Sequence, residues 1–502
     1  MTSPEALFQR AHALHRSGDL AGAAVGYREV LAAAPGHGEA LHFLGVVAWQ
    51  QGRPGEAEPL LRRALAAGAT APRHCNLGGV LRQRGDLPGA LAAYREALRL
   101  DPGDAGARTG LKDALARHGL ALAEGRAFPE AEAAFRELLA LEPRHAAALN
   151  NLGKLVQRQG DLEAALALFD RALAVDPGYG LGRFNRGICA LGLERLPEGW
   201  ADLEASVDFW IHTMDRRRDA PWAGAPLWDG VCLEGKRLLA WGDQGLGDEL
   251  LFAGLIPDLQ ARGARVHVDC EPRLARLLER SFPSLRAWPR GGAGPDPQDL
   301  DLQAPGLWLA GRLRPDFGSF PRRAGYLRAD GDLTAGLRAR YGGPGVRRIT
   351  GIAWRSGPRD RPSPRGLPLP ELAAALPLEG VRYVDLQYGD TAEERAEARS
   401  ANPGFDLLHD DGVDQLRDLD RFAAQVAACD DVVTIGNTTA HVAGALGVPG
   451  LVLLPVQSLT WYWFRERPES PWYPGLDLLR QRAAGDWSAP LAELRERRRA
   501  LD

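Results

Sequence analysis

The N-terminal part of the chain repeats a pattern of small and large side chains with a fixed period. Prolines that close successive units stand at Pro143 and Pro177, 34 positions apart. In each unit a small residue is followed twelve positions later by a second small residue, and four positions after that by a large one. The six units place Ala11, Ala23 and Tyr27; Gly45, Ala57 and Leu61; Gly78, Ala90 and Tyr94; Gly119, Ala131 and Phe135; Gly153, Ala165 and Phe169; and Gly187, Gly199 and Leu203 at these positions. Such spacing predicts helix pairs that approach closely and bury their apolar faces only by stacking on their neighbours.

This pattern resembles the tetratricopeptide repeat (TPR), whose helix pairs stack into a curved solenoid. We expect about six units over residues 1–216, the last of them degenerate. Turns of the types SGDL, RGDL and QGDL are placed between the two helices of a unit. An extra stretch, Ala105–Leu111, interrupts the period between the third and fourth units.

Asparagine recurs on the first helix of several units, which in such solenoids lines a concave groove for other proteins. The asparagines at or beside the sixth position of this helix are Asn76, Asn150, Asn151 and Asn185. Their amides can donate to and accept from the backbone of an extended peptide. The arrangement resembles the asparagine ladder of protein O-GlcNAc transferases, although a solvated polar inner face would look the same. Other units carry Gln9, Phe43 and Arg117 instead.

Composition excludes several classes of protein. With 61 basic and 65 acidic residues, the formal net charge of −4 offers no general attraction for nucleic acid. The five cysteines form no C-x-x-C pair, which speaks against a zinc framework or a disulfide scaffold. No apolar run approaches the ~18 residues that span a bilayer, and the first residues lack the apolar region of a signal peptide. We therefore expect a cytoplasmic protein with no membrane span.

The second half of the chain alternates between apolar strands and amphipathic helices. Strands are predicted at 236–242, 264–270, 348–354, 380–387, 430–436 and 448–456. A glycine-rich linker, Tyr341–Arg348, divides this half. We predict two α/β lobes with parallel sheets, 217–345 and 346–502, and a ligand-binding cleft between them.

A glycine turn, Gly242–Asp248, follows the first predicted strand, at the end where open α/β sheets bind ligands. A dinucleotide site is one interpretation, because Asp269 closes the next strand. Counted from Gly245, however, the fingerprint places Leu250 where a third small residue is needed. Asp248 then remains as a carboxylate at the start of a helix. It is a candidate catalytic group, although an aspartate there is also a common helix cap.

A second polar turn, Gly436–Thr439, joins a buried strand to a helix of small residues. Backbone N–H groups and the positive end of the helix dipole favour an anion there, and diphosphate is the natural ligand. His441, one turn into the helix, fits either a phosphate contact or a core histidine. The candidate donor-binding residues at this turn and after the strand at 348–354 are Arg355, Arg365, Asn437, Thr438, Thr439 and His441.

At this point the chain resembles bacterial TPR proteins that carry heptosyltransferase-like domains. The matching segments run in the family's order: WDGVCLEGKRLLAWGDQGLGDELLFA, GIAWRSGP with RGLPL, VDLQ, VTIGNTTAHVAGALGVPGLVLLP, and SPWYPGLDLLRQ with GDW. The resemblance covers essentially the whole chain. It implies a GT-B glycosyltransferase with two Rossmann-like lobes, an acceptor toward the first lobe, a nucleotide sugar on the second as co-substrate, and neither a cofactor nor a catalytic metal.

The resemblance also assigns roles to single residues. Asp248 matches the aspartate of the family's L-G-D motif, the expected general base, and Arg365 matches a basic residue expected to contact the diphosphate. Asn437 stands where the family has an aspartate, and Thr460 replaces an acid before the closing aromatic segment Trp461–Trp463. These departures leave donor identity and activity open.

With a solenoid to recruit it, a protein acceptor is expected, and the resemblance suggests flagellin. A lipopolysaccharide-type heptosyltransferase and a catalytically inactive TPR adaptor are the alternatives. The chain also contains two acidic triplets of the kind that metal-dependent transferases use, Asp299–Asp301 and Asp418–Asp420. The first begins a predicted strand and the second a predicted helix, so we interpret both as structural.

Overall fold

A computed structural model describes residues 3–213, 220–242, 245–357, 363, 365–457 and 459–499. Contacts divide the chain into two compact units, Met1–Leu155 with Ala174–Asp176, and Val156–Leu173 with Pro177–Asp502. The last repeats thus belong to the same compact unit as the α/β part. Among the described residues, no helix has the length and apolar character needed to cross a bilayer.

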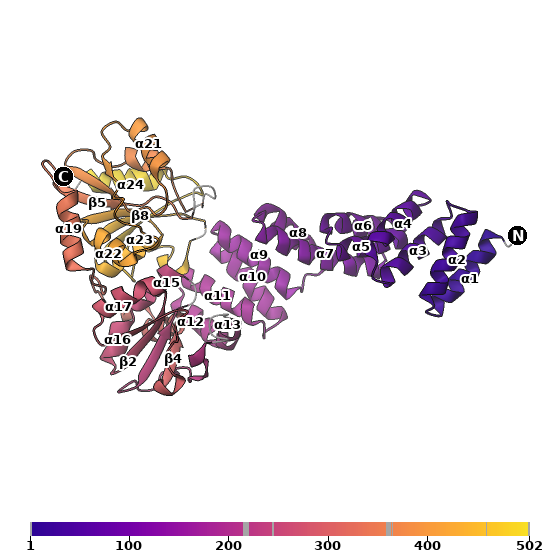
Figure 1. Cartoon of the computed structure of the whole chain (residues 1–502), viewed down its shortest axis with the longest axis horizontal. Helices are drawn as coiled ribbons and strands as arrows, with labels where there is room; N and C mark the ends of the chain where they lie inside the picture. Colours follow the sequence, from indigo (N-terminus) through magenta and orange to yellow (C-terminus); the bar gives the residue numbers. More distant parts are fainter. Residues whose placement is uncertain are drawn as a thin grey trace. The chain divides into compact units, whose positions relative to one another are not determined.

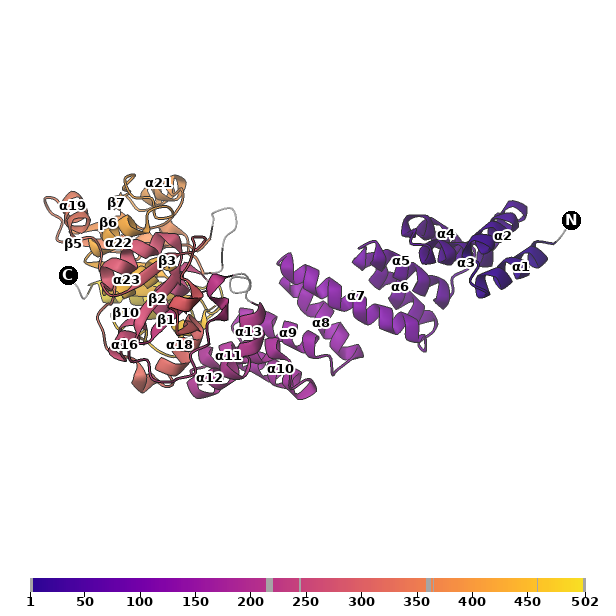
Figure 2. The ribbon, with the colours of Figure 1, turned by 60° about the horizontal axis from the view of Figure 1, so that its bottom comes forward.

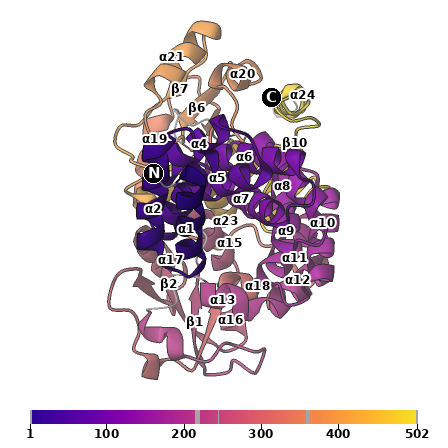
Figure 3. The same cartoon turned by 90° about the vertical axis from the view of Figure 1, so that its right-hand side faces the viewer.

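The predicted helical repeat is confirmed (Figure 1). Its helices are α1 (Pro4–Arg16), α2 (Leu20–Ala33), α3 (Gly38–Gln50), α4 (Pro54–Ala66), α5 (Ala71–Gln83), α6 (Leu87–Leu100), α7 (Ala105–Glu124), α8 (Phe128–Leu141), α9 (Ala146–Gln159), α10 (Leu162–Val175), α11 (Gly180–Gly192) and α12 (Leu196–Ala205). The two helices of the last pair, α11 and α12, lie side by side (Figure 3). A short helix, α13 (Val207–Thr213), follows.

The small residues of the repeat lie where the two helices of a pair touch. A β-carbon built on Gly78 would be 2.8 Å from the ring of Tyr94, and one on Gly119 would be 2.8 Å from the ring of Phe135. Close packing of this kind leaves no room for a larger side chain. The stretch Ala105–Leu111 forms the first two turns of α7, so it lengthens a helix without breaking the alternation of helices.

The α/β part contains two sheets, and every strand pairing in them is parallel, as predicted (Figures 1 and 2). The first sheet has the order β3-β2-β1-β4 and the second β10-β9-β8-β5-β6-β7. The strands are β1 (Arg237–Trp241), β2 (Arg265–Cys270), β3 (Arg286–Pro289), β4 (Leu302–Pro305), β5 (Arg348–Ile352), β6 (Val381–Asp385), β7 (Leu407–Leu408), β8 (Asp431–Ile435), β9 (Gly450–Leu454) and β10 (Leu476–Arg480).

Short helices connect these strands. In the first lobe they are α15 (Leu246–Ala253), α16 (Ile256–Ala261), α17 (Ala275–Ser281), α18 (Gly306–Leu313) and α19 (Gly331–Tyr341). In the second lobe they are α20 (Leu369–Ala374), α21 (Ala392–Ala401), α22 (Leu419–Ala427), α23 (Thr438–Leu446) and α24 (Ser488–Arg499). The 3₁₀ turns of the described part of the chain are η1 (Pro221–Gly224), η2 (Pro272–Leu274), η3 (Pro297–Asp299), η4 (Phe317–Ser319) and η5 (Trp461–Trp463).

The order of the strands fixes where the lobes can bind a ligand. In the first sheet the chain moves outward from β1 in one direction and returns to β4 on its other side, and in the second sheet it does the same around β5 and β8. Ligands of open α/β sheets bind at the carboxyl ends of the strands beside such a switch point. Helix α15 begins after β1 and helix α23 begins after β8, and the two helices pack against each other.

Candidate functional site at the contact of the two lobes

The first turn of α15 meets α23 through a glycine. A β-carbon built on Gly247 would be 2.9 Å from Cδ2 of His441 and 3.0 Å from its Nε2. Such a contact requires glycine, because an added side chain would overlap the imidazole ring. Asp248, the next residue, is half-buried at the edge of this contact. The structure therefore brings the candidate catalytic carboxylate of the first lobe to the start of the polar helix of the second.

Charges from both lobes act on one phenol. The pKa of Tyr462 is raised, first by burial and then by the carboxylate of Asp248, whereas the guanidinium of Arg365 lowers it. Both charged groups thus lie near the same ring, one on each lobe. Tyr462 is itself 7% exposed and packs against His441 with ring centroids 5.1 Å apart. Asp248 thus lies beside the residue that touches His441, and Arg365 acts on the phenol that packs against the same imidazole.

The hydroxyl of Tyr473 holds the imidazole of His441 by a hydrogen bond, with 2.8 Å between the oxygen and Nδ1. A second tyrosine, Tyr326, interacts with Tyr473. Tyr326 donates from its hydroxyl to the carbonyl of Leu250 in α15 at 2.7 Å, since a carbonyl can only accept. These contacts connect the histidine of α23 with the first lobe.

Burial decides the charge of this histidine. His441 is 2% exposed, and burial lowers its pKa to about 3. This burial fits the interpretation of His441 as a core histidine, and its contact with a diphosphate stays a prediction.

The polar turn before α23 is occupied largely by its own asparagine. The Oδ1 atom of Asn437 accepts from the N–H of Thr439 at 3.0 Å and from that of Ala440 at 3.4 Å, and also from the hydroxyl of Thr434 at 3.1 Å. Asn437 is the N-cap of α23, and 7% of it is exposed. Thr439 is buried as well. Thr438 is the half-exposed residue of this turn, and contact of the turn with a ligand stays a prediction.

The two candidate arginines after β5 differ in what they contact. Arg355 forms an ion pair with Glu394 at 3.0 Å, and its guanidinium also donates to the carbonyls of Gly357 and Asp390 at 3.0 Å each. Arg355 thus clamps its own loop, and its contact with a donor stays a prediction. Arg365 is half-buried, and within the described ranges no carboxylate lies within ion-pair distance of its guanidinium.

Trp463 belongs to this site, although sequence reasoning placed it only in a closing aromatic segment. Its indole N–H is buried and has no hydrogen-bond partner among the residues that the structure describes. A β-carbon built on Gly436 would lie 2.9 Å from that nitrogen, so the N–H is next to the turn before α23. An unpartnered buried donor is costly. In the sequence, an aromatic residue near a strand end is too common a feature to indicate that Trp463 belongs to the site.

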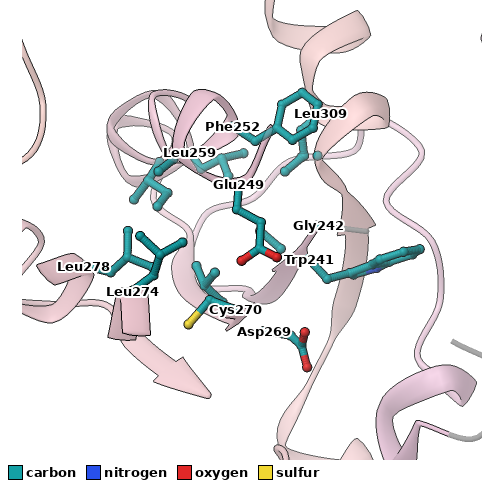
Figure 4. Close-up of a pocket in the computed structure, with 15 residues that line it drawn as sticks. Trp241, Gly242, Glu249, Phe252, Leu259, Asp269, Cys270, Leu274, Leu278 and Leu309 are labelled. Atoms are coloured by element: carbon teal, nitrogen blue, oxygen red, sulfur yellow. The ribbon is translucent and has the colours of Figure 1, made fainter. Parts of the chain in front are cut away.

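A separate apolar pocket lies inside the first lobe, at the carboxyl ends of β1 and β2. Figure 4 shows the Glu249 side chain projecting into it among leucine side chains. The Glu249 carboxylate accepts from the backbone N–H of Glu271 and from Arg290, both at 2.7 Å. Arg290 lies 3.4 Å from Asp269 as well. These groups are paired within the lobe, and the pocket differs from the predicted site.

Both acidic triplets are structural, as interpreted from the sequence. Asp301 accepts from the backbone N–H of Arg237 at 2.8 Å. Asp418 caps α22, and Asp420 binds the guanidinium of Arg280 through two bonds of 2.6 Å.

The predicted asparagine groove is only partly supported. Asn150 is fully buried and Asn185 is 6% exposed, which does not favour contact of these two residues with a bound peptide. Asn76 is half-buried and lies 2.8 Å from Nε2 of His42. Asn151 is also half-buried. We retain Asn76 and Asn151 as candidates for contact with a partner.

Comparison with known proteins first defines the class of the helical part. Tetratricopeptide repeat models match residues 14–76, 78–119, 117–180 and 152–209. Cellulose synthase operon protein C of Pseudomonas fluorescens is 41% identical over 117 residues, which are 20% of this chain and 9% of that protein. A solved structure, that of YrrB, described as a TPR protein with an unusual peptide-binding site, is 25% identical and covers 36% of this chain and 90% of its own, with a TM-score of 0.29.

A relative that spans both halves defines the family. Protein FlbA of Caulobacter vibrioides is 30% identical over 543 residues, which are 96% of this chain and 82% of that protein. The chain is a TPR protein with a C-terminal α/β part, and it belongs to the family of Protein FlbA.

Proposed function

We propose that this chain is a glycosyltransferase that moves a sugar from a nucleotide-sugar donor to a hydroxyl group of a protein. One observation carries the proposal: the first turn of α15, which holds the carboxylate of Asp248, packs through Gly247 against His441 of α23. The guanidinium of Arg365 and the carboxylate of Asp248 also act on the phenol of Tyr462, which packs on that imidazole. Both follow the strands that flank the switch points of their sheets. A GT-B arrangement of the two lobes is part of this proposal.

The leaving nucleotide diphosphate is assigned to the second lobe. Arg365, which acts on the phenol of Tyr462, offers positive charge, and the half-exposed Thr438 and the buried indole N–H of Trp463 offer donors beside the start of α23. The dipole of this helix adds to the attraction for negative charge. Donors fixed in advance around developing charge are an effective way to stabilise a transition state.

Asp248 is assigned the role of general base. It would take the proton of the acceptor hydroxyl while that oxygen forms a bond to the anomeric carbon. The bond from this carbon to the diphosphate breaks at the same time, and the electron pair leaves with the phosphate oxygen. Attack from the face opposite the leaving group inverts the anomeric configuration. The half-buried position of Asp248 leaves it accessible to an acceptor.

The solenoid is assigned the recruitment of the acceptor, because TPR units commonly bind extended protein segments. Flagellin is the acceptor that we propose to test first. A lipopolysaccharide acceptor would leave the solenoid without a role in the reaction.

An inactive adaptor is the second candidate. It is favoured by the commitment of the Asn437 side chain to capping α23, since the family's aspartate at this position has no counterpart here.

Two measurements test the proposal. The first is the melting temperature of the whole chain with nucleoside diphosphates and nucleotide sugars, because a ligand that binds the native state stabilises it by an amount that rises with the logarithm of its concentration over its Kd. We expect at least one nucleotide to raise the melting temperature. The second is the intact mass of flagellin co-expressed with this chain, where we expect the increment of a sugar. Partner binding without nucleotide binding or a mass increment would favour the adaptor.

A further inference from the structure

The segment Thr460–Arg467, here named the aromatic strap, lies between the solenoid and the site. On one side Tyr462 and Trp463 pack against His441, with ring centroids 5.1 Å and 5.3 Å apart. On the other side Trp461 meets Trp200 of α12 edge to face at 5.6 Å. One strap therefore contacts both the last helix pair of the repeat and the residues of the proposed site.

The turn between α11 and α12, which reaches the strap, differs from most of the other repeat turns in the residue that adopts a positive φ. A residue with positive φ stands between the two helices of each pair, and in four pairs it is glycine: Gly18, Gly52, Gly85 and Gly160. The two exceptions are Arg126, with φ of 63°, and Glu194, with φ of 64°. A residue with a side chain is strained in this region, and strain of this kind is a reason to look for a function.

The side chain of Glu194 at this strained position contacts the strap. Its Oε1 atom accepts from the backbone N–H of Glu466 at 2.9 Å, and its Oε2 atom lies 3.3 Å from Nε of Arg467. The strap is strained too, because Phe464 has a φ of 47°. From the opposite side, Arg480 donates to the carbonyls of Trp463 at 2.7 Å and Arg467 at 2.9 Å.

A neighbouring repeat turn also meets the second lobe. A β-carbon on Gly160 would lie 2.7 Å from the carbonyl oxygen of Val456, so this turn must keep its glycine. Glu163 pairs with Arg465 at 2.6 Å. Both Glu163 and Glu194 thus reach the strap, but Glu163 pairs with a strap side chain, whereas Glu194 accepts from the strap backbone.

We infer that Glu194 is a positioning residue for the proposed reaction: it fixes the backbone of the strap so that Tyr462 and Trp463 face the site. This inference rests on the proposed function for its effect on turnover, but its effect on the strap can be measured separately. A residue of the TPR part thereby contributes to the site of the α/β part.

The test is the substitution Glu194→Gly, with Arg126→Gly as matched control. Both changes relieve the same backbone strain at the same place in a repeat, so both are expected to keep or raise the melting temperature. Only Glu194→Gly removes the acceptor for Glu466. We expect hydrogen exchange of the strap amides to accelerate at least about tenfold in Glu194→Gly, and turnover to fall about 10–100-fold, because small displacements of reacting groups cost rate. Arg126→Gly is expected to leave both unchanged.

A second variant, Glu194→Gln, keeps an acceptor for the N–H of Glu466 and is expected to recover most of the exchange protection. The inference is overturned if Glu194→Gly leaves strap exchange at the level of the natural chain, or if turnover falls equally in Arg126→Gly. If the natural chain transfers no sugar, the proposed function fails. The exchange measurement then still decides whether Glu194 holds the strap.

Discussion

Gly247 of the first lobe rests directly on the imidazole of His441 of the second, with only 3.0 Å between a built β-carbon and Nε2. This contact brings the first turn of α15 to the aromatic residues around α23. Because Asp248 follows Gly247 in the chain, the same contact determines where the candidate base lies. The relationship between these two residues therefore links the packing of the lobes to the chemistry that we propose.

The first prediction concerns Asp248. Asp248→Asn should lower turnover about 10²–10⁴-fold, which is the usual contribution of a general base, and should leave the fold intact. Asp332→Asn is the matched control, because Asp332 is also an aspartate in the first turn of a helix but is exposed. Initial rates of sugar transfer and the melting temperature are measured for both. Equal rates in the two variants would reject Asp248 as the base.

A second prediction separates the two arginines after β5. Arg365→Ala should weaken nucleotide binding about 10–100-fold with little change in stability, since a charged hydrogen bond contributes ~1.5–3 kcal/mol. Arg355→Ala should lower the free energy of unfolding by ~3 kcal/mol, because Glu394 would lose its ion-pair partner in a mostly buried position. Titration calorimetry with the best nucleotide and chemical denaturation measure the two effects. The opposite assignment would follow if Arg355→Ala lost affinity while remaining stable.

The third prediction is a dependence of stability on pH. His441 has a pKa of about 3 in the folded chain, against an ordinary value of 6.5, so below pH 6.5 the unfolded chain binds a proton that the folded chain does not. Its contribution to stability is complete above pH 6.5 and is lost as the pH falls from 6.5 toward 3. Between pH 7.5 and 5.0 the free energy of unfolding falls by ~2 kcal/mol, because the loss of about 1.4 kcal/mol per pH unit begins only below pH 6.5.

His441→Asn should reduce this pH dependence by a similar amount. Tryptophan fluorescence is a suitable probe during denaturation, because twelve of the 13 tryptophans lie at or after Trp200. The assignment would be contradicted if the free energy of unfolding of His441→Asn fell between pH 7.5 and 5.0 by as much as that of the natural chain.

A fourth prediction distinguishes the cap of α23 from its exposed neighbour. Asn437→Ala should lower the free energy of unfolding by ~1 kcal/mol, the usual cost of losing a helix N-cap. Thr438→Ala should change stability by less than about 0.5 kcal/mol, as surface substitutions do, but should weaken nucleotide binding. Denaturation curves and thermal shifts with nucleotide test the pair. If both variants lost the same stability and kept the same affinity, Thr438 would not belong to the donor site.

The local sequence pattern predicted the architecture well, because the helical repeat and the alternation of strands and helices depend on residues that are close together in the sequence. The spacing that joins Gly78 to Tyr94 within a helix pair can be counted along the chain, and the structure places the two residues in contact. The alternation of apolar strands and helices likewise predicted the two parallel sheets.

The sequence by itself determined the helical repeat, the two α/β lobes and the carboxylate after the first strand, since periodicity and strand ends follow from local order. Only the tertiary structure decided which polar residues are accessible. Arg355 and Arg365 look alike in the sequence, but Glu394, 39 positions after Arg355, engages one of them. Asn150 and Asn151 are adjacent, yet only the second retains exposed surface. Hydrogen bonds and burial join residues that are distant along the chain, and no local pattern records those partners.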